Sequence, residues 1–273
     1  MKNIKTTFLT GLLCLSVCVH SSGQCLGRSL PFTSSGKETS QLNWINTNVL
    51  AEYDVATIGG NNGDTVTSIL DSGPYGYHMR TTNSPKYMVN AATNDSLPHV
   101  GFNIFGMTDQ MAGTNFSTTF PQPTSVFMVF DSTAAAAENT YDFFVDNCNV
   151  PGTATLPQDG YKTSANQTMD AGGTAIFNAI TNFGGVLRIY EFYFNGASSY
   201  IASNGVQTIT GNPGSNGRKG IAIAGPRNWD LTLIAPMNFY YALFCTNSID
   251  SFSRSNILYK IARKYGIKEV TYP

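Results

Sequence analysis

Charged side chains are scarce in this 273-residue chain. Only 12% of the residues are Asp, Glu, Lys or Arg, and the formal net charge is −1. A protein that binds nucleic acid needs clustered Lys and Arg to neutralise phosphates, and the sequence has no basic stretch of that kind. Nucleic acid is therefore not an expected partner. Gly, Ser, Thr and Asn take the place of the missing charges, which agrees with export.

Long apolar runs are also missing after the first residues. The apolar stretch 8–19 follows Lys2 and Lys5 and precedes Ser21–Gly23, an order typical of a secretory signal peptide. We therefore expect residues 1–23 to be removed and the mature chain to be extracellular, at the cell surface or periplasmic. The stretch is too short to span a bilayer, and no later run approaches the ~20 residues of a transmembrane helix.

Cysteine is scarce in the mature chain. Cys14 and Cys18 lie in the expected signal peptide, which leaves Cys25, Cys148 and Cys245. In an oxidising compartment these three allow one disulfide and one free thiol. The sequence leaves all three pairings open.

Short strands separated by Gly, Asn, Pro and Ser fill the rest of the chain. The clearest run is 186–225, in which Asn195-Gly196 and Asn204-Gly205 separate stretches rich in Ile, Tyr and Phe. Asn-Gly favours a two-residue type I′ turn because both residues tolerate positive φ, so we expect an antiparallel meander that ends in a strand at Gly220–Gly225. Further strands are expected at Val66–Leu70, Lys86–Ala91, His99–Ile104, Ser125–Phe130, Tyr141–Asp146, Thr174–Phe177 and Met237–Cys245.

The strand pattern predicts a β-sandwich. Along Ile189–Phe194, three aromatic residues point to one face, while Ile189 and Tyr193 point to the other. A strand with apolar residues on both faces is expected to be central in its sheet and covered on both sides.

One helix is expected near the C-terminus. Its N-cap is Asp250 or Ser251 and its end is Gly266, and its apolar face is formed at helical spacing by Leu258, Ile261, Ala262 and Tyr265. We expect this helix to cover an edge or an end of the sandwich with its basic side in solvent. The predicted fold is thus all-β, an antiparallel two-sheet jelly-roll sandwich with one C-terminal helix.

Several motifs occur in the order found in a known family. The segment Val66–His78, with Asp71 and Ser72-Gly73, is similar to the V-x-x-W-x-D-x-S-G-x-G-x-H stretch of LamG-like, concanavalin A-like jelly-roll domains. The similarity continues at Ser84–Tyr87, Leu97–Asn103, Pro123–Phe130, Phe194–Gly196, Asn204-Gly205 and Ile257–Ile267. The resemblance covers about residues 50–268. It implies one LamG-like domain over residues 42–273, with residues 24–41 as an N-terminal tether.

Metal binding receives little support from the residues. The family's F-D-G motif is Phe102-Asn103-Ile104 here, which removes a carboxylate. Calcium needs six to eight oxygen ligands, whereas Asp64, Asp71 and Asp109 are scattered. We therefore expect no cofactor. The resemblance to the family leaves bound calcium as an open alternative.

Catalytic patterns are missing too. Glycoside hydrolysis needs two carboxylates, and the Glu-x-Asp-x-Glu strand of jelly-roll glycanases does not occur here. Glu191 stands alone and is expected to be paired structurally. The mature chain keeps His78, expected to brace a loop, and His99, expected to be a half-buried structural residue, and neither belongs to a nucleophile or zinc motif. The sequence favours a protein without catalysis but leaves the question open.

Binding through loops at the end of the sandwich is the favoured function. Aromatic faces, amides and guanidinium groups bind sugars, and the candidates in expected loops are Tyr75, Tyr77, Asn216, Arg227, Asn228 and Trp229. We expect an exported, non-catalytic module that recognises a glycan or a cell-surface glycoprotein. Two alternatives stay open: a glycan-active hydrolase or lyase on the same fold, and a structural adhesin or virion or surface assembly subunit that associates with copies of itself.

Overall fold

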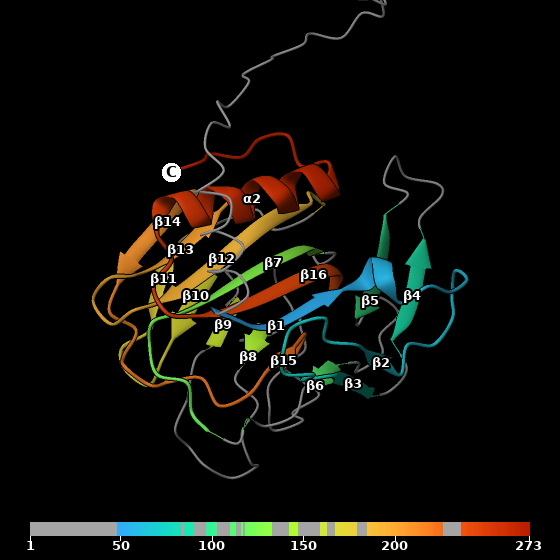
Figure 1. Ribbon diagram of the computed structural model, residues 1–273, viewed down its shortest axis with the longest axis horizontal. Coiled ribbons are helices and arrows are strands. Elements are labelled where there is room, and N and C mark those ends of the chain that lie inside the picture. Colours follow the sequence, from blue (N-terminus) through green and yellow to red (C-terminus); the bar gives the residue numbers. More distant parts are fainter. Residues whose placement is uncertain are drawn as a thin grey trace, which may run out of the picture.

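The architecture comes from a computed structural model. It describes residues 48–82, 85–89, 97–102, 110–112, 116, 118–132, 142–146, 159–162, 167–178, 185–225 and 236–273. These residues form two mainly antiparallel sheets, each of eight strands, and one α-helix (Figure 1). The predicted all-β sandwich with a C-terminal helix is confirmed. The expected signal peptide and tether lie outside the described residues, so export stays a prediction.

The first sheet, called sheet A, has the strand order β14-β13-β12-β7-β16-β5-β4, and β1 also pairs with β16. Its strands are β1 (Val49–Asp54), β4 (Lys86–Val89), β5 (Pro98–Phe102), β7 (Thr124–Ser132), β12 (Arg188–Phe194), β13 (Ser199–Ser203), β14 (Val206–Gly211) and β16 (Met237–Thr246). The long strand β16 pairs with β7 along its whole length, while β5 and β1 share its other edge.

The second sheet, called sheet B, has the strand order β11-β10-β9-β8-β15-β6-β3-β2. Its strands are β2 (Ser68–Ile69), β3 (Met79–Thr82), β6 (Gln110–Ala112), β8 (Asp142–Asp146), β9 (Asp159–Lys162), β10 (Gln167–Asp170), β11 (Ile176–Asn178) and β15 (Ala222–Ile223). A short 3-10 helix, η1 (Val55–Thr57), follows β1.

The predicted meander is confirmed for β12, β13 and β14 but not beyond them. Asn204 and Gly205 have φ values of 48° and 81°, as a type I′ turn requires. At the other Asn-Gly pair only Gly196 has a positive φ, and four residues, Asn195 to Ser198, join β12 to β13. The predicted two-residue turn is wrong there, because Ser199 Oγ accepts a hydrogen bond from Asn195 N (2.7 Å) and stabilises a wider loop.

The expected fourth strand of the meander belongs to the other sheet. Residues Ala222–Ile223 form β15, which pairs with β6 and β8 in sheet B. Turn residues report only local conformation, and the loop after β14 is long enough to carry the chain from one sheet to the other.

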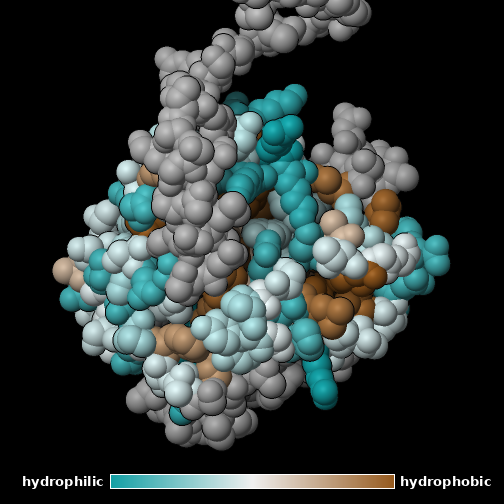
Figure 2. Space-filling model, in the orientation of Figure 1, coloured by the Kyte–Doolittle hydropathy of each residue, from teal (hydrophilic) through white to brown (hydrophobic). Residues whose placement is uncertain are grey.

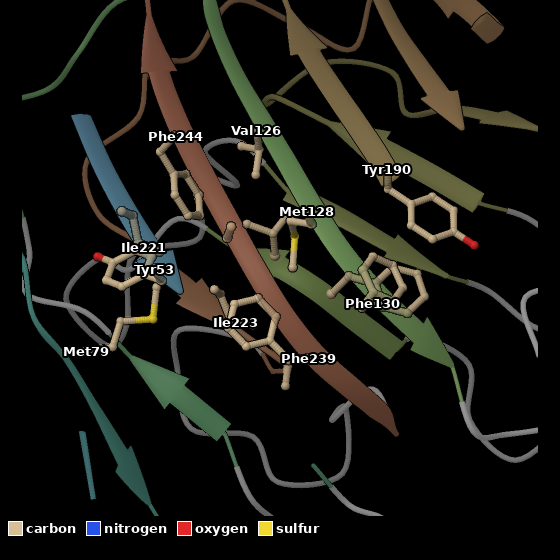
Figure 3. Packing of buried hydrophobic residues seen from close by; sticks show 14 of the residues in the cluster. Tyr53, Met79, Val126, Met128, Phe130, Tyr190, Ile221, Ile223, Phe239 and Phe244 are labelled. Carbon is tan, nitrogen blue, oxygen red and sulfur yellow. The ribbon is translucent and has the colours of Figure 1, made fainter. Parts of the chain in front are cut away.

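The main core lies between the two sheets. Tyr190, Phe192 and Phe194 of β12 point into it, whereas Ile189 points to the opposite face, so the prediction of a strand covered on both sides is confirmed. Phe130 of β7 lies at the centre of an aromatic stack (Figure 3). Its ring centroid is 4.3 Å from that of Tyr190 and 4.6 Å from that of Phe144.

The helix α2 (Ser251–Tyr265) has the predicted ends. Asp250 Oδ1 accepts a hydrogen bond from Ser253 N (2.7 Å), and Gly266 ends the helix with φ 67°. The helix covers the outer face of sheet A rather than an edge or an end, so that expectation was wrong (Figure 1). The reason is that β7, β12 and β16 carry apolar side chains on both faces. Within the described residues, no helix combines the length and apolarity needed to cross a membrane.

Cys245 lies in the layer between α2 and sheet A. It is buried and has a free thiol. Burial raises the pKa of this thiol, so it stays protonated and unreactive. Cys25 and Cys148 lie outside the described residues. Of the three possible disulfides, Cys25–Cys148 is the one that leaves Cys245 free.

Candidate functional site

The loop that carries Tyr75 and Tyr77 is held by the aspartate of the family-like motif. Asp71 Oδ1 accepts hydrogen bonds from Glu52 N (2.8 Å) and Gly73 N (2.7 Å), and Oδ2 accepts one from Tyr77 N (2.7 Å). Asp71 N in turn donates to His78 Nδ1 (3.0 Å). The prediction that His78 braces this loop is confirmed, and Asp71 ties the loop to β1.

The same hydrogen bonds are relevant to whether these aspartates could bind a calcium ion. Both carboxylate oxygens of Asp71 already accept backbone N–H groups, and Asp64 Oδ2 accepts one from Asn61 N (2.7 Å). Among the residues that the structure describes, no three His, Cys, Asp or Glu side chains form a group suited to a metal ion. Asp109 lies outside those residues.

Four aromatic rings meet at one end of the sandwich and form what we call the aromatic rim cluster: Tyr75, Tyr77, Phe116 and Phe120. Tyr75 stacks on Tyr77 with a centroid distance of 5.6 Å and an interplanar angle of 15°. Phe116 lies 4.5 Å from Tyr77 and 5.3 Å from Phe120, whose ring is 6.4 Å from Tyr75. Phe116 is buried, whereas Tyr75 is 54% exposed. The half-buried rings of Tyr77 and Phe120, packed on the buried ring of Phe116, thus support one ring that faces solvent.

The loop with Asn216 borders this cluster. Phe120 and Arg218 exchange both backbone hydrogen bonds, each 2.7 Å long. The Arg218 guanidinium is buried between the rings of Phe194 (5.7 Å) and Phe244 (5.3 Å), which anchors the loop in the core. The segment around Phe120 therefore brings two of the predicted binding loops together.

A side-chain amide joins the loops further along the rim. Gln122 Nε2 donates to the backbone oxygens of Gly214 (3.1 Å) and Asn216 (3.0 Å), and Gln122 Oε1 accepts from Gly196 N (2.6 Å). Sequence reasoning missed Gln122, Phe116 and Phe120. No local pattern marks them, because their partners lie about 40 to 100 residues away in the chain.

The other predicted binding residues are not placed. Arg227, Asn228 and Trp229 lie outside the described residues. Their position relative to the aromatic rim cluster stays a prediction.

Glu191 is structural, as predicted. Its side chain is 1% exposed and forms an ion pair with Arg254, with Oε2 2.8 Å from Nη2. Arg254 Nε also donates to both carboxylate oxygens, and Tyr200 donates its hydroxyl to Oε1 (2.7 Å). Burial raises the pKa of Glu191, and these two partners oppose that rise. The carboxylate joins β12 to α2 and is not accessible to a substrate.

A pair of carboxylates on β1 escaped the sequence reasoning. Glu52 and Asp54 alternate along β1 and therefore lie on one face of the strand. Tyr241 donates its hydroxyl to Glu52 Oε1 (2.8 Å), and Tyr265 donates to Asp54 Oδ1 (3.1 Å). Asp54 also pairs with Lys264 of α2. Asp54 thus fastens α2 to sheet A, whereas Glu52 joins β1 to β16 within that sheet.

His99 is more deeply buried than the sequence predicted. It is 3% exposed, its ring is 5.1 Å from that of Tyr240, and its Nδ1 lies 3.2 Å from Leu97 O. Burial lowers its pKa, and the Leu97 carbonyl and the Asp131 carboxylate only partly oppose the shift. The folded protein therefore favours the neutral imidazole.

This burial predicts a pH dependence of stability. Because the folded protein binds the His99 proton more weakly than the unfolded chain does, protonation favours unfolding, and stability falls as the pH drops below about 6.5. Urea denaturation of the parent and of His99→Gln between neutral and mildly acidic pH measures the effect. We expect a shallower decline for His99→Gln. Equal slopes for the two proteins would contradict the assignment.

Comparisons with known proteins establish the fold alone. No family model matches the sequence, and no curated protein matches it. Among solved structures, a botulinum neurotoxin type C structure aligns with a TM-score of 0.59 at 9% identity, over 81% of this chain and 53% of the toxin chain. The binding domain of botulinum neurotoxin DC in complex with SialylT gives 0.55 at 9% identity, over 80% and 52%. Trypanosoma rangeli sialidase in complex with sialic acid gives 0.57 at 8% identity, over 80% and 33%.

This chain spans about half the length of the toxin chains and a third of the sialidase chain. Likeness at such low identity is evidence of shared architecture. The described residues therefore form a β-sandwich similar to one present in these proteins.

Proposed function

We propose that this chain is an exported, non-catalytic binding module of the LamG-like type that recognises a glycan or a surface glycoprotein through loops at the rim of its sandwich. The aromatic rim cluster carries the proposal. Tyr75 is 54% exposed and stacked on Tyr77, which is itself packed against Phe116. A ring held in this way stays available to a ligand without the cost of ordering it on binding.

The chemistry beside the ring suits a sugar. The apolar C–H face of a pyranose packs on an aromatic face, and its hydroxyl groups need donors and acceptors nearby. The loop 212–217 next to Phe120 supplies backbone groups and the residues Asn212, Ser215 and Asn216. An aromatic surface with polar groups at its margin is the arrangement that a sugar requires.

The similar structures support carbohydrate or glycoprotein partners in general. Cell entry of the type C toxin depends on two ganglioside molecules, the DC toxin domain forms complexes with SialylT and with rat synaptotagmin II, and the sialidase forms one with sialic acid. Because this chain aligns with only part of each protein, the likeness supports the class of partner and not a particular sugar.

A catalytic role has less support. Glu52, Asp54 and Glu191 each hold structural hydrogen bonds, and Glu191 is buried in an ion pair. A glycoside hydrolase needs an acid and a base or nucleophile that can reach the scissile bond. Glu191 does not meet that requirement, and Glu52 and Asp54 are already engaged by Tyr241, Tyr265 and Lys264.

A glycan array tests the proposal with the parent and Tyr75→Ala. We expect the parent to retain specific glycans and Tyr75→Ala to bind them about tenfold more weakly, because a stacked aromatic contributes about 1 kcal/mol or more. Tyr75→Phe keeps the ring and should keep most of the binding, and Val206→Ala removes exposed apolar surface on β14, remote in sequence from the cluster.

Two outcomes would contradict the proposal. One is a folded parent that retains no glycan. The other is an equal loss in Tyr75→Ala and Val206→Ala, since that would place the binding elsewhere. Circular dichroism of each variant shows whether the fold is kept.

A further inference from the structure

The solvent side of α2 carries aromatic and basic residues where a helix on a sandwich needs only polar ones. The helix buries one face, formed by Ile257, Leu258, Ile261, Ala262 and Tyr265, against sheet A. Its opposite stripe contains Phe252, Tyr259 and Arg263, which recur at helical spacing. Phe252 is 45% exposed. Phe252 therefore leaves a large part of its surface in solvent on the outer side of the helix.

The C-terminal tail enlarges this surface. Residues 266–273 turn back along α2 (Figure 1). Tyr272, 44% exposed, packs edge-on against Tyr259 with a centroid distance of 6.2 Å. Ser255 Oγ donates to Pro273 O (2.8 Å), and Thr271 N donates to Asn204 O (2.8 Å), so the tail is fastened to both the helix and the β13–β14 turn. Helix and tail form one layer on the outside of sheet A.

The charge of this layer differs from that of the whole chain. Residues 251–273 contain five Lys or Arg and one acid, Glu269, although the formal net charge of the chain is −1. Lys260, Arg263 and Lys268 are exposed, while Lys264 pairs with Asp54. Where α2 is visible in Figure 2, the side chains drawn are mainly hydrophilic. The layer therefore presents a positive surface with aromatic rings in it.

We propose that this α2–tail face docks on the surface of an anionic lipid bilayer. Lys and Arg near such a surface are attracted to its headgroups, and Tyr and Phe side chains enter the boundary between headgroups and acyl chains. A soluble polyanion would use the cations but would gain less from an exposed Phe, which has no polar atom to offer it. The contact is separate from the aromatic rim cluster and does not depend on glycan recognition.

Vesicle co-sedimentation tests this docking with the purified chain. The probes are vesicles of phosphatidylcholine alone and of phosphatidylcholine mixed with phosphatidylglycerol. We expect binding to the anionic vesicles only, weakened by added salt. Each cation near the membrane contributes about a fivefold factor, so Lys260→Gln/Arg263→Gln should bind about 25-fold more weakly. Arg80→Gln/Lys86→Gln removes two cations from β3 and β4 and should bind like the parent.

A variant of the aromatic residues distinguishes binding to a bilayer from binding to a soluble polyanion. Phe252→Ser/Tyr272→Ser should weaken binding to anionic vesicles but leave binding to dextran sulfate unchanged. Circular dichroism confirms that this variant is folded. The proposal fails if the folded parent binds neither kind of vesicle, or if the two charge variants lose vesicle binding to the same extent. It also fails if the aromatic variant binds anionic vesicles as the parent does. The last result would indicate that the face recognises polyanions.

Discussion

Glu191→Ala lowers the free energy of unfolding by about 3–5 kcal/mol, because it leaves the Arg254 guanidinium buried without its counter-charge. Nothing else described takes the place of the carboxylate: Arg254 keeps a hydrogen bond to Gly205 O (3.2 Å) and a position 5.2 Å from the centre of the Tyr200 ring. The loss also loosens the junction between β12 and α2. Urea denaturation monitored by circular dichroism measures the change as a shift of the midpoint.

A double variant distinguishes the contribution of the ion pair to the free energy of unfolding from the destabilisation that an unpaired buried charge causes. Glu191→Leu/Arg254→Met replaces both partners with apolar side chains and should recover most of the stability lost in Glu191→Ala. Tyr200→Phe removes only one hydrogen bond to Glu191 and should cost about 1–2 kcal/mol. A Glu191→Ala protein within about 0.5 kcal/mol of the parent would show that water or another side chain satisfies Arg254.

Phe130→Ala is expected to cost about 3–5 kcal/mol as well, for a different reason. The Phe130 ring is buried at the centre of the inter-sheet core and stacks on Tyr190 at 4.3 Å (Figure 3). Its removal loses the transfer energy of the ring and leaves a cavity that rigid strands on both sides cannot close. Thermal and urea unfolding both report this loss.

Matched changes show whether the cavity is the cause. Phe130→Leu keeps most of the side-chain volume and should lower the free energy of unfolding clearly less than Phe130→Ala does. Leu70→Ala removes apolar atoms from a side chain that is 62% exposed and should stay within about 0.5 kcal/mol of the parent. Equal losses for Phe130→Ala and Leu70→Ala would contradict the position of the inter-sheet core.

The structure changes the meaning of the motif that suggested the family. In sequence, Asp71 was one of three scattered carboxylates that gave little support to a calcium site, and His78 was expected to brace a loop. In the structure, both side chains accept hydrogen bonds from the backbone of this loop: Asp71 Oδ2 from Tyr77 N, and His78 Nδ1 from Asp71 N. The motif therefore supports the proposed site indirectly, because it holds the loop on which Tyr75 is presented.

Features that depend on neighbouring residues were predictable from the sequence. The cap at Asp250, the end of α2 at Gly266 and the turn at Asn204-Gly205 follow from hydrogen bonds and φ angles within a few residues. The two-sided burial of β12 follows from its alternating side chains. The sequence by itself thus determined the class of fold and the local form of its best-marked elements.

Only the tertiary structure decided which distant segments meet. It assigned β15 to sheet B, laid α2 on a face of sheet A, and paired Glu191 with Arg254, 63 residues away. It also joined the Tyr75 loop to Phe120 and, through Phe120, to the loop of Asn216. Such contacts depend on how two sheets and a helix share their apolar faces, and no pattern within one short segment contains that information.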